Sequence, residues 1–81
     1  GYSLERGIST ASLLEADGKR AMMEAAGTVC LLADSTKFNK IQFARICDWD
    51  RIDCFITDSA TEEFVRALAE RSVRVITPET V

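Results

Sequence analysis

A strand, a helix and a second strand follow one another between residues 53 and 77, and no other feature constrains the fold as strongly. Residues 53–57 (DCFIT) and 73–77 (VRVIT) are short apolar runs. The segment between them places apolar residues on one face of a helix, at Phe64, Val65 and Leu68. A crossover of this length joins two parallel strands in a βαβ unit. The sequence therefore predicts an α/β fold in which helices flank a mostly parallel sheet.

Another helix is expected from about Ser12 to Ala26. Ser12 and Glu15 have the spacing of a capping box, and Gly27 is typical of the position just past a helix end. Apolar or small residues recur at helical spacing, at Leu14, Gly18, Met22 and Ala25. We expect this stripe to face the sheet. Glycine inside a helix costs about 1 kcal/mol relative to alanine, so Gly18 is expected to allow a close approach there.

Three further segments complete the predicted fold. Residues 28–33 (TVCLLA) are continuously apolar, as in strands covered on both faces, and are the predicted central strand. Residues 43–47 are a candidate for another short strand, whereas residues 1–10 resemble a loop. Ser59 and Glu62 repeat the capping-box spacing and predict the start of the second helix.

The length of the chain limits it to one small domain. With 81 residues, 47% of them hydrophobic, its composition is that of a globular protein, but a core of this size is marginal without help from elsewhere. The chain starts with Gly1 rather than methionine, and we expect it to be a fragment of a longer protein. Trp49 is expected to be a partly buried loop aromatic or, as the alternative, an anchor at an interface.

Composition excludes several function classes. The chain has no histidine, which excludes Ser-His-Asp and Cys-His nucleophilic systems, and no metal or cofactor is expected. Three cysteines without C-x-x-C spacing favour free structural thiols in a reducing compartment. A net charge of −3 has the wrong sign for a DNA-binding surface. No apolar run approaches the ~20 residues that cross a bilayer, so we expect a cytoplasmic protein without a membrane partner.

The turn Asp34-Ser35-Thr36-Lys37 follows the predicted central strand. It is therefore expected at the carboxyl end of a parallel sheet, where open α/β proteins bind ligands. The hydroxyls of Ser35 and Thr36 and the amine of Lys37 can meet phosphate or sugar oxygens, and Asp34 can accept hydrogen bonds from sugar hydroxyls. The alternative is an ordinary Asx turn, in which Asp34 bonds its own backbone and Lys37 is solvated.

Four short motifs occur in order along nearly the whole chain: Gly7-Ile8-Ser9-Thr10, the pair Glu15 and Lys19, the run from Ala33 to Phe38 (ADSTKF), and Ile56-Thr57-Asp58. Together they resemble the C-terminal effector-sensing domain of DeoR-family transcriptional regulators, bacterial proteins that control sugar metabolism genes. The resemblance implies a sensor that binds a phosphorylated sugar, with a Rossmann-like fold similar to that of ribose-5-phosphate isomerase. It also implies an N-terminal helix-turn-helix that is not in this chain.

On this resemblance, residues 1–81 are a single partial domain, the C-terminal half of the sensor. The full protein is expected to bind DNA through the absent helix-turn-helix only, and to form a homo-oligomer. The implied effector site comprises Thr10, Asp34, Ser35, Thr36 and Lys37. Glu15 and Lys19 are assigned to the same site or, alternatively, form a surface ion pair, because residues at i and i+4 meet on a helix.

A sugar-phosphate isomerase is the alternative function. Isomerases of that fold resemble this chain in an A-D-x-S-K run, but their catalytic glutamate lies in an R-E-K motif that an ungapped comparison places at Lys19. A lysine cannot act as that carboxylate base. We therefore expect a repressor without enzymatic activity, in which effector binding shifts the DNA-binding competence of the full protein.

Overall fold

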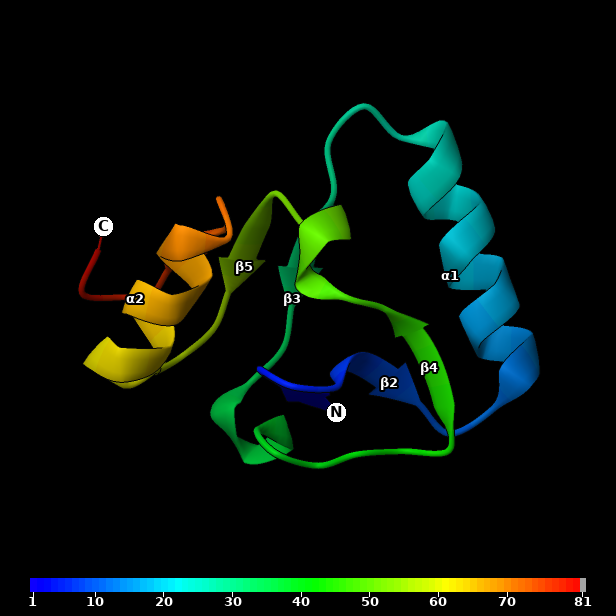
Figure 1. The fold of residues 1–81 in the computed structure, drawn as a ribbon, viewed down its shortest axis with the longest axis horizontal. Helices are drawn as coiled ribbons and strands as arrows, with labels where there is room; N and C mark the ends of the chain where they lie inside the picture. The colour runs from blue at the N-terminus through cyan, green and yellow to red at the C-terminus, as the bar shows by residue number, and fades with distance from the viewer. Residues whose placement is uncertain (81) are drawn as a thin grey trace.

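The computed structural model describes residues 1–80, which form two three-stranded sheets flanked by two helices (Figure 1). The antiparallel sheet has the order β1-β2-β4 and consists of β1 (Tyr2–Ser3), β2 (Gly7–Thr10) and β4 (Ala44–Cys47). The parallel sheet has the order β3-β5-β6 and consists of β3 (Cys30–Leu32), β5 (Cys54–Ile56) and β6 (Arg74–Ile76). The helices are α1 (Leu13–Ala25) and α2 (Glu62–Glu70), and two short 3₁₀ helices are η1 (Ser35–Lys37) and η2 (Trp49–Arg51).

The α/β class is confirmed, and β3, β5 and β6 form the predicted parallel sheet, but a second sheet of equal strand number is antiparallel and was not predicted. Helix α1 packs on the antiparallel sheet through β4 and β2, and α2 packs on the parallel sheet through β6. Figure 1 shows the two helices at opposite sides of the molecule, with β3 between them. The predicted strand at 43–47 exists as β4, but it pairs antiparallel with β2. Strand direction depends on which segments meet, and the apolar runs do not specify this.

The first ten residues form a hairpin rather than the predicted loop. Tyr2 pairs with Ile8, and Ile8 in turn pairs with Cys47 of β4. Gly7 allows this approach because its φ is +71° and a Cβ on it would lie only 2.3 Å from the carbonyl oxygen of Cys47. Strands of two and four residues are too short to show an alternating pattern, so the sequence did not reveal the hairpin.

A cluster of aromatic rings joins the two sheets. The ring of Tyr2 from β1 lies 4.9 Å from that of Phe55 on β5 and 5.8 Å from that of Phe64 on α2. Phe38 and Trp49 complete the cluster, at 5.7 Å and 6.2 Å from Tyr2. Edge-on and tilted pairs at these separations contribute about 0.5–1.5 kcal/mol each beyond their apolar burial. The cluster is therefore the main packing contact between the antiparallel sheet and the βαβ unit.

Trp49 is fully buried rather than partly buried. None of its surface is exposed, and its indole Nε1 donates a hydrogen bond to the carbonyl oxygen of Ser3 at 2.8 Å. The residue therefore fastens η2 to the hairpin, which excludes the alternative of an exposed anchor at an interface.

The βαβ unit is confirmed. Strands β5 and β6 pair in parallel on either side of α2, with Phe55 opposite Val75. Phe64 and Leu68 of α2 are buried as predicted. The cap is Thr61 rather than Ser59, since the Thr61 hydroxyl accepts the Phe64 backbone N–H at 3.1 Å. Two hydroxyl residues precede this helix, and capping spacing alone did not distinguish them.

Strand β3 is confirmed as a parallel strand, but its predicted central position is wrong. In residues 1–80 it pairs only with β5, which is the central strand of the sheet. Leu32 is 77% exposed and Cys30 is also exposed, so the described residues do not cover β3 on both faces. An apolar run reports that a strand prefers burial, but not which segments cover it.

Helix α1 begins and ends where predicted, but its predicted contact face is wrong. The Ser12 hydroxyl accepts the Glu15 backbone N–H at 3.1 Å. However, the stripe predicted to face the sheet is exposed, namely Leu14, Gly18, Met22 and Ala25. The helix packs instead through fully buried Ala16 and half-buried Met23, and Arg20 Nη1 donates to the Arg45 carbonyl oxygen at 2.5 Å. No atom lies within 4 Å of a Cβ built on Gly18, so this glycine makes no close approach.

The three cysteines are free thiols, as predicted. Neither α1 nor α2 has the length and apolar character that a helix crossing a membrane requires.

We predict that Phe55→Ala lowers the free energy of unfolding by about 3–5 kcal/mol, because Phe55 is fully buried in the aromatic cluster. Phe43→Ala is the matched control, since Phe43 is 80% exposed and should change that free energy by no more than about 0.5 kcal/mol. Urea unfolding followed by Trp49 fluorescence measures both. Similar losses in the two variants would contradict the assignment of the core.

Candidate functional site

A cavity of about 250 Å³ lies where the antiparallel sheet, α1, β3 and η1 meet. Hydrophilic side chains on its wall are Ser9 and Thr10 of β2, Lys19 of α1, Lys37 of η1, and Gln42 from the segment before β4. Ile8, Leu31 and Ile46 supply part of the apolar wall. The cavity therefore combines cations and uncharged polar groups with an apolar floor, as small-molecule sites do.

The charge of this cavity is opposite to that of the chain. The chain has 13 acidic and 10 basic residues, yet Lys19 and Lys37 line the cavity and no carboxylate of residues 1–80 does. Within residues 1–80, the ion pairs involve arginines, and neither lysine takes part in one. Two exposed ammonium groups without a carboxylate partner in residues 1–80 give this cavity a local positive charge.

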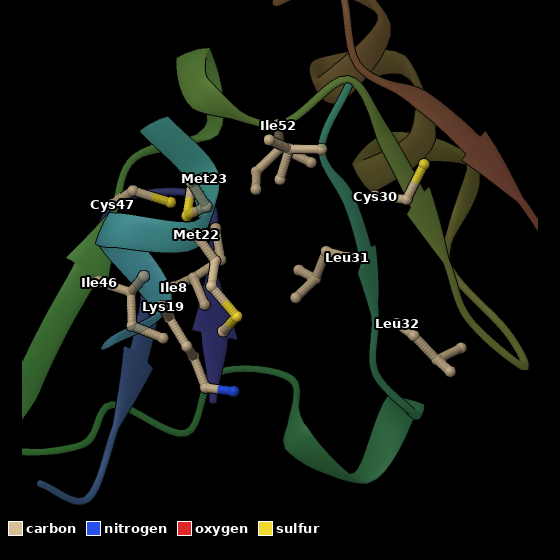
Figure 2. Close-up of a pocket in the computed structure, with 11 residues that line it drawn as sticks. Ile8, Lys19, Met22, Met23, Cys30, Leu31, Leu32, Ile46, Cys47 and Ile52 are labelled. Atoms are coloured by element: carbon tan, nitrogen blue, oxygen red, sulfur yellow. The ribbon is translucent and has the colours of Figure 1, made fainter. Parts of the chain in front are cut away.

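A second cavity, of about 270 Å³, adjoins the first, and Lys19, Ile8 and Leu31 line both. Figure 2 shows Lys19 and Met22 extending from α1, with Leu31 on β3 across the space. Apart from the Lys19 amine, the side chains around the second cavity are apolar or carry sulfur, for example Met23. Only the first cavity is lined by both lysines, and we call it the lysine cavity.

The turn after β3 is an Asx turn that leads into η1. Asp34 caps η1, because its Oδ1 accepts the Thr36 backbone N–H at 2.9 Å and also the Thr36 hydroxyl. These hydrogen bonds lower the pKa of Asp34 below its ordinary value of 3.8. The Asx turn anticipated as an alternative is therefore present. Lys37 is exposed, as that alternative expects, and it also lies on the wall of the lysine cavity.

Asp58, two residues past the end of β5, fastens this turn to the parallel sheet. Its Oδ1 accepts the Ser35 backbone N–H at 2.6 Å, and its Oδ2 accepts the Ser35 hydroxyl at 3.0 Å. The Ser35 hydrogen bonds lower the pKa of Asp58 below 3.8. The sequence analysis noted Asp58 only as part of a motif and assigned no role to it. The carboxyl ends of β3 and β5 are adjacent in a parallel sheet, and this geometry could have identified the contact.

Glu15 and Lys19 do not form the surface ion pair considered as an alternative. Glu15 Oε2 instead accepts the Thr10 hydroxyl at 2.5 Å, which ties the end of β2 to the first turn of α1. In the described part of the chain no carboxylate lies within 4.0 Å of the Lys19 amine. Lys19 is left to line the cavity, while Glu15 acts on the neighbouring hydroxyl.

The structure brings three of the predicted site residues together at the lysine cavity: Thr10, Lys19 and Lys37. The others surround it without lining it: Glu15, Asp34, Ser35 and Thr36. Ser9 and Gln42 also line it and were not assigned to the site from the sequence. Ser9 lies in the Gly7–Thr10 motif, of which only Thr10 was given a role, and Gln42 lies on a connecting segment without a motif.

Comparison with known proteins gives consistent results. The family description "DeoR C terminal sensor domain" matches residues 1–59. The chain is 38% identical over 74 residues to an Escherichia coli O157:H7 protein whose name refers to a transcriptional repressor of the aga operon. It is 33% identical over 63 residues to the HTH-type transcriptional regulator IolR of Bacillus subtilis (strain 168), and 36% identical over 59 residues to the HTH-type transcriptional regulator GlpR of Haloferax volcanii.

These alignments cover most of the chain but a small part of each relative. They include 90%, 78% and 73% of the chain, against 28%, 25% and 23% of the three relatives in the same order. The chain thus spans about a quarter of the length of the curated relatives it matches. The segment matched to the family, residues 1–59, contains every residue that lines the lysine cavity and also Asp58.

We predict that Asp58→Asn loosens the turn that carries Lys37. The substitution removes the negative charge and replaces one acceptor oxygen opposite Ser35 with a donor. Amide hydrogen exchange at Ser35 should accelerate, which mass spectrometry or NMR measures. Asp50→Asn, at an exposed aspartate on η2, is the control and should leave this exchange rate unchanged. An unchanged exchange rate in Asp58→Asn would show that the hydrogen bonds between Asp58 and Ser35 do not stabilise the turn.

We also predict that acid releases the turn. Folding lowers the pKa of Asp34 and Asp58 below 3.8, so their stabilising effect is complete above that pH and is lost as the pH falls through the lowered values. The NMR chemical shifts of the Ser35 and Thr36 backbone amides report the protonation of Asp58 and Asp34. These shifts should therefore change with midpoints below pH 3.8. In Asp58→Asn the Ser35 titration should disappear and the Thr36 titration persist. A midpoint above 3.8 would contradict the assigned hydrogen bonds.

Proposed function

The chain belongs to the DeoR C-terminal sensor domain family, and on this premise we propose that its lysine cavity binds the phosphate group of a phosphorylated sugar. It is thus part of a DeoR-family transcriptional regulator, and the sensor domain is the effector-binding part of such proteins. The observation that carries the proposal is the pairing of Lys19 and Lys37 in a cavity without a carboxylate. A phosphate monoester with about −1.5 to −2 charges at pH 7 is well matched to two ammonium groups.

The size and polarity of the cavity support a sugar phosphate over other anions. About 250 Å³ is below the roughly 300–1,000 Å³ typical of sites for drug-sized ligands, which favours a small metabolite. Lysine binds phosphate as a mobile point charge, and the uncharged polar groups at Ser9, Thr10 and Gln42 are suited to sugar hydroxyls. Inorganic phosphate alone would use only the lysines.

The turn residues take two roles in this proposal. Lys37 contacts the effector directly. Asp34 holds η1 through Oδ1, and Ser35 and Thr36 fix the path of the turn, so these three residues position Lys37 at the cavity. Thr10 faces the effector from β2, and Glu15 orients the Thr10 hydroxyl through their hydrogen bond. Lys19 supplies the second cation.

We propose that residues 1–81 are the C-terminal half of a Rossmann-like sensor, similar in fold to ribose-5-phosphate isomerase. The exposure of β3 supports this, since parallel sheets are normally covered on both faces. The full protein would bind DNA through a helix-turn-helix and would act as a homo-oligomer on paired operator sites. Effector binding would favour one arrangement of the sensor, and a coupling of about 1–3 kcal/mol would change operator affinity 5- to 150-fold.

The same cavity argues against isomerase activity. Aldose–ketose isomerisation needs a general base at the substrate carbon, and a carboxylate commonly fills that role. In residues 1–80 no carboxylate lines the lysine cavity, and Lys19 stands where the comparison with isomerases placed their catalytic glutamate. Ligand binding without chemistry is therefore the function that the residues support.

We predict that Lys37→Ala abolishes the response to the effector. In a thermal-shift panel of pentose and hexose phosphates, the intact wild-type protein should gain about 2.7 kcal/mol of stability at a hundred times the dissociation constant of its effector. Lys37→Ala should lose this gain and keep operator binding, because it removes a cation from the cavity and nothing from the DNA-binding part. Operator binding with and without the sugar phosphate is measured by fluorescence anisotropy.

Lys40→Ala is the matched control for this experiment. Lys40 is exposed, carries the same charge three residues away, and does not line the lysine cavity. Its variant should respond to the effector as the wild type does. Loss of the response in both variants, or in neither, would refute the assignment of Lys37.

A further inference from the structure

Most uncharged polar groups of the lysine cavity are already committed to hydrogen bonds within the protein. The Ser9 hydroxyl accepts the Gln42 backbone N–H at 2.9 Å and lies 3.4 Å from the Gly1 carbonyl oxygen, to which it donates. The Thr10 hydroxyl donates its hydrogen to Glu15. These two hydroxyls can still accept hydrogen bonds, but they have no hydrogen left to donate to a ligand.

The Gln42 carboxamide is the exception. No acceptor in residues 1–80 takes the hydrogens of Nε2, although the side chain lines the cavity. The Gln42 backbone is itself held by Ser9 of β2, so the amide projects from a fixed point. The cavity wall therefore carries one uncharged donor, held in place through its backbone, besides the ammonium groups of Lys19 and Lys37.

A cation recognises the negative charge of a ligand, whereas an uncharged donor recognises the position of an oxygen atom. Lys19 and Lys37 attract any anion, and their flexible stems adapt to its position. An amide hydrogen at a fixed position distinguishes a ligand with an oxygen there from one without, because the unmatched donor is left unpaired once the ligand displaces water. The three donors also come from three elements: α1, η1 and the segment before β4.

We propose that Gln42 is the specificity-determining residue of the effector site. Its Nε2 donates a hydrogen bond to one hydroxyl oxygen of the sugar, while Lys19 and Lys37 hold the phosphate. The inference rests on the proposed function, and it assigns the choice among sugar phosphates to a residue that no motif identified. Affinity for phosphate and selection of the sugar are thus separate properties of the site.

The test uses the intact protein and isothermal titration calorimetry. The ligands are inorganic phosphate, the sugar phosphate that the wild type binds most tightly, and the monodeoxy analogues of that sugar phosphate. Gln42→Leu keeps the side-chain size and removes the donor. Phe43→Leu is the control, because Phe43 is the next residue, is 80% exposed and does not line the cavity.

Gln42→Leu should weaken binding of the preferred sugar phosphate about tenfold, the loss of roughly one hydrogen bond, and leave binding of inorganic phosphate unchanged. One deoxy analogue should bind the wild type and Gln42→Leu equally, because it lacks the hydroxyl that Gln42 contacts. Phe43→Leu should bind every ligand as the wild type does.

Two outcomes would overturn the inference while the proposed function stands. In one, Gln42→Leu binds the preferred sugar phosphate as tightly as the wild type does. In the other, the affinity of every deoxy analogue falls in Gln42→Leu by the same factor as that of the preferred sugar phosphate. A different result overturns the proposed function and the inference with it: no sugar phosphate binds the wild type, or Lys37→Ala binds them all as tightly as the wild type.

Discussion

The packing of Tyr2 is the contact on which the rest of the structure depends. Its ring lies on the antiparallel sheet and meets Phe55 of the parallel sheet and Phe64 of α2 at 4.9 Å and 5.8 Å, and Trp49 closes the cluster from η2. In residues 1–80 no strand of one sheet pairs with a strand of the other, so this apolar contact, together with the polar contacts of Arg71 with Leu4 and Asp48, sets their relative position. Tyr2 also lines the lysine cavity. The residue that joins the two sheets is thus also part of the cavity wall.

Placing the site between two sheets determines its electrostatics. The lysines reach the cavity from different elements, Lys19 from α1 on the antiparallel sheet and Lys37 from η1 after β3. Carboxylates on these elements are occupied elsewhere: Glu15 accepts from Thr10, Asp17 pairs with Arg20, and Asp34 accepts from Thr36. A chain of net charge −3 thereby acquires a cationic cavity. An anion held by both lysines would draw α1 and η1 together, which is a physical route from ligand binding to a change in the arrangement of the sheets.

Local patterns in the sequence predicted the elements but not their partners. The capping hydroxyl of Ser12, the apolar run before Asp34 and the βαβ unit after residue 53 were all read correctly, because each depends on neighbours within a few residues. The exposure of the stripe through Leu14 and Met22 and the edge position of β3 were not predicted. Both depend on which distant segment packs against them. Ser59 was preferred to Thr61 as a cap on spacing alone, and the chain path decided otherwise.

The sequence by itself determined the membership of a family, the strand–helix–strand order and the chemistry of the turn, since these follow from residue identity and short spacing. It also identified Lys37, Thr10 and Lys19 as candidates, and the structure brings these three to one cavity. Only the tertiary structure decided that residues 1–10 form a hairpin, that Asp58 clamps Ser35, and that Gln42 faces the lysines. These arrangements join residues that lie from several to several tens of positions apart. They arise from burial and hydrogen bonding in three dimensions, which no local pattern encodes.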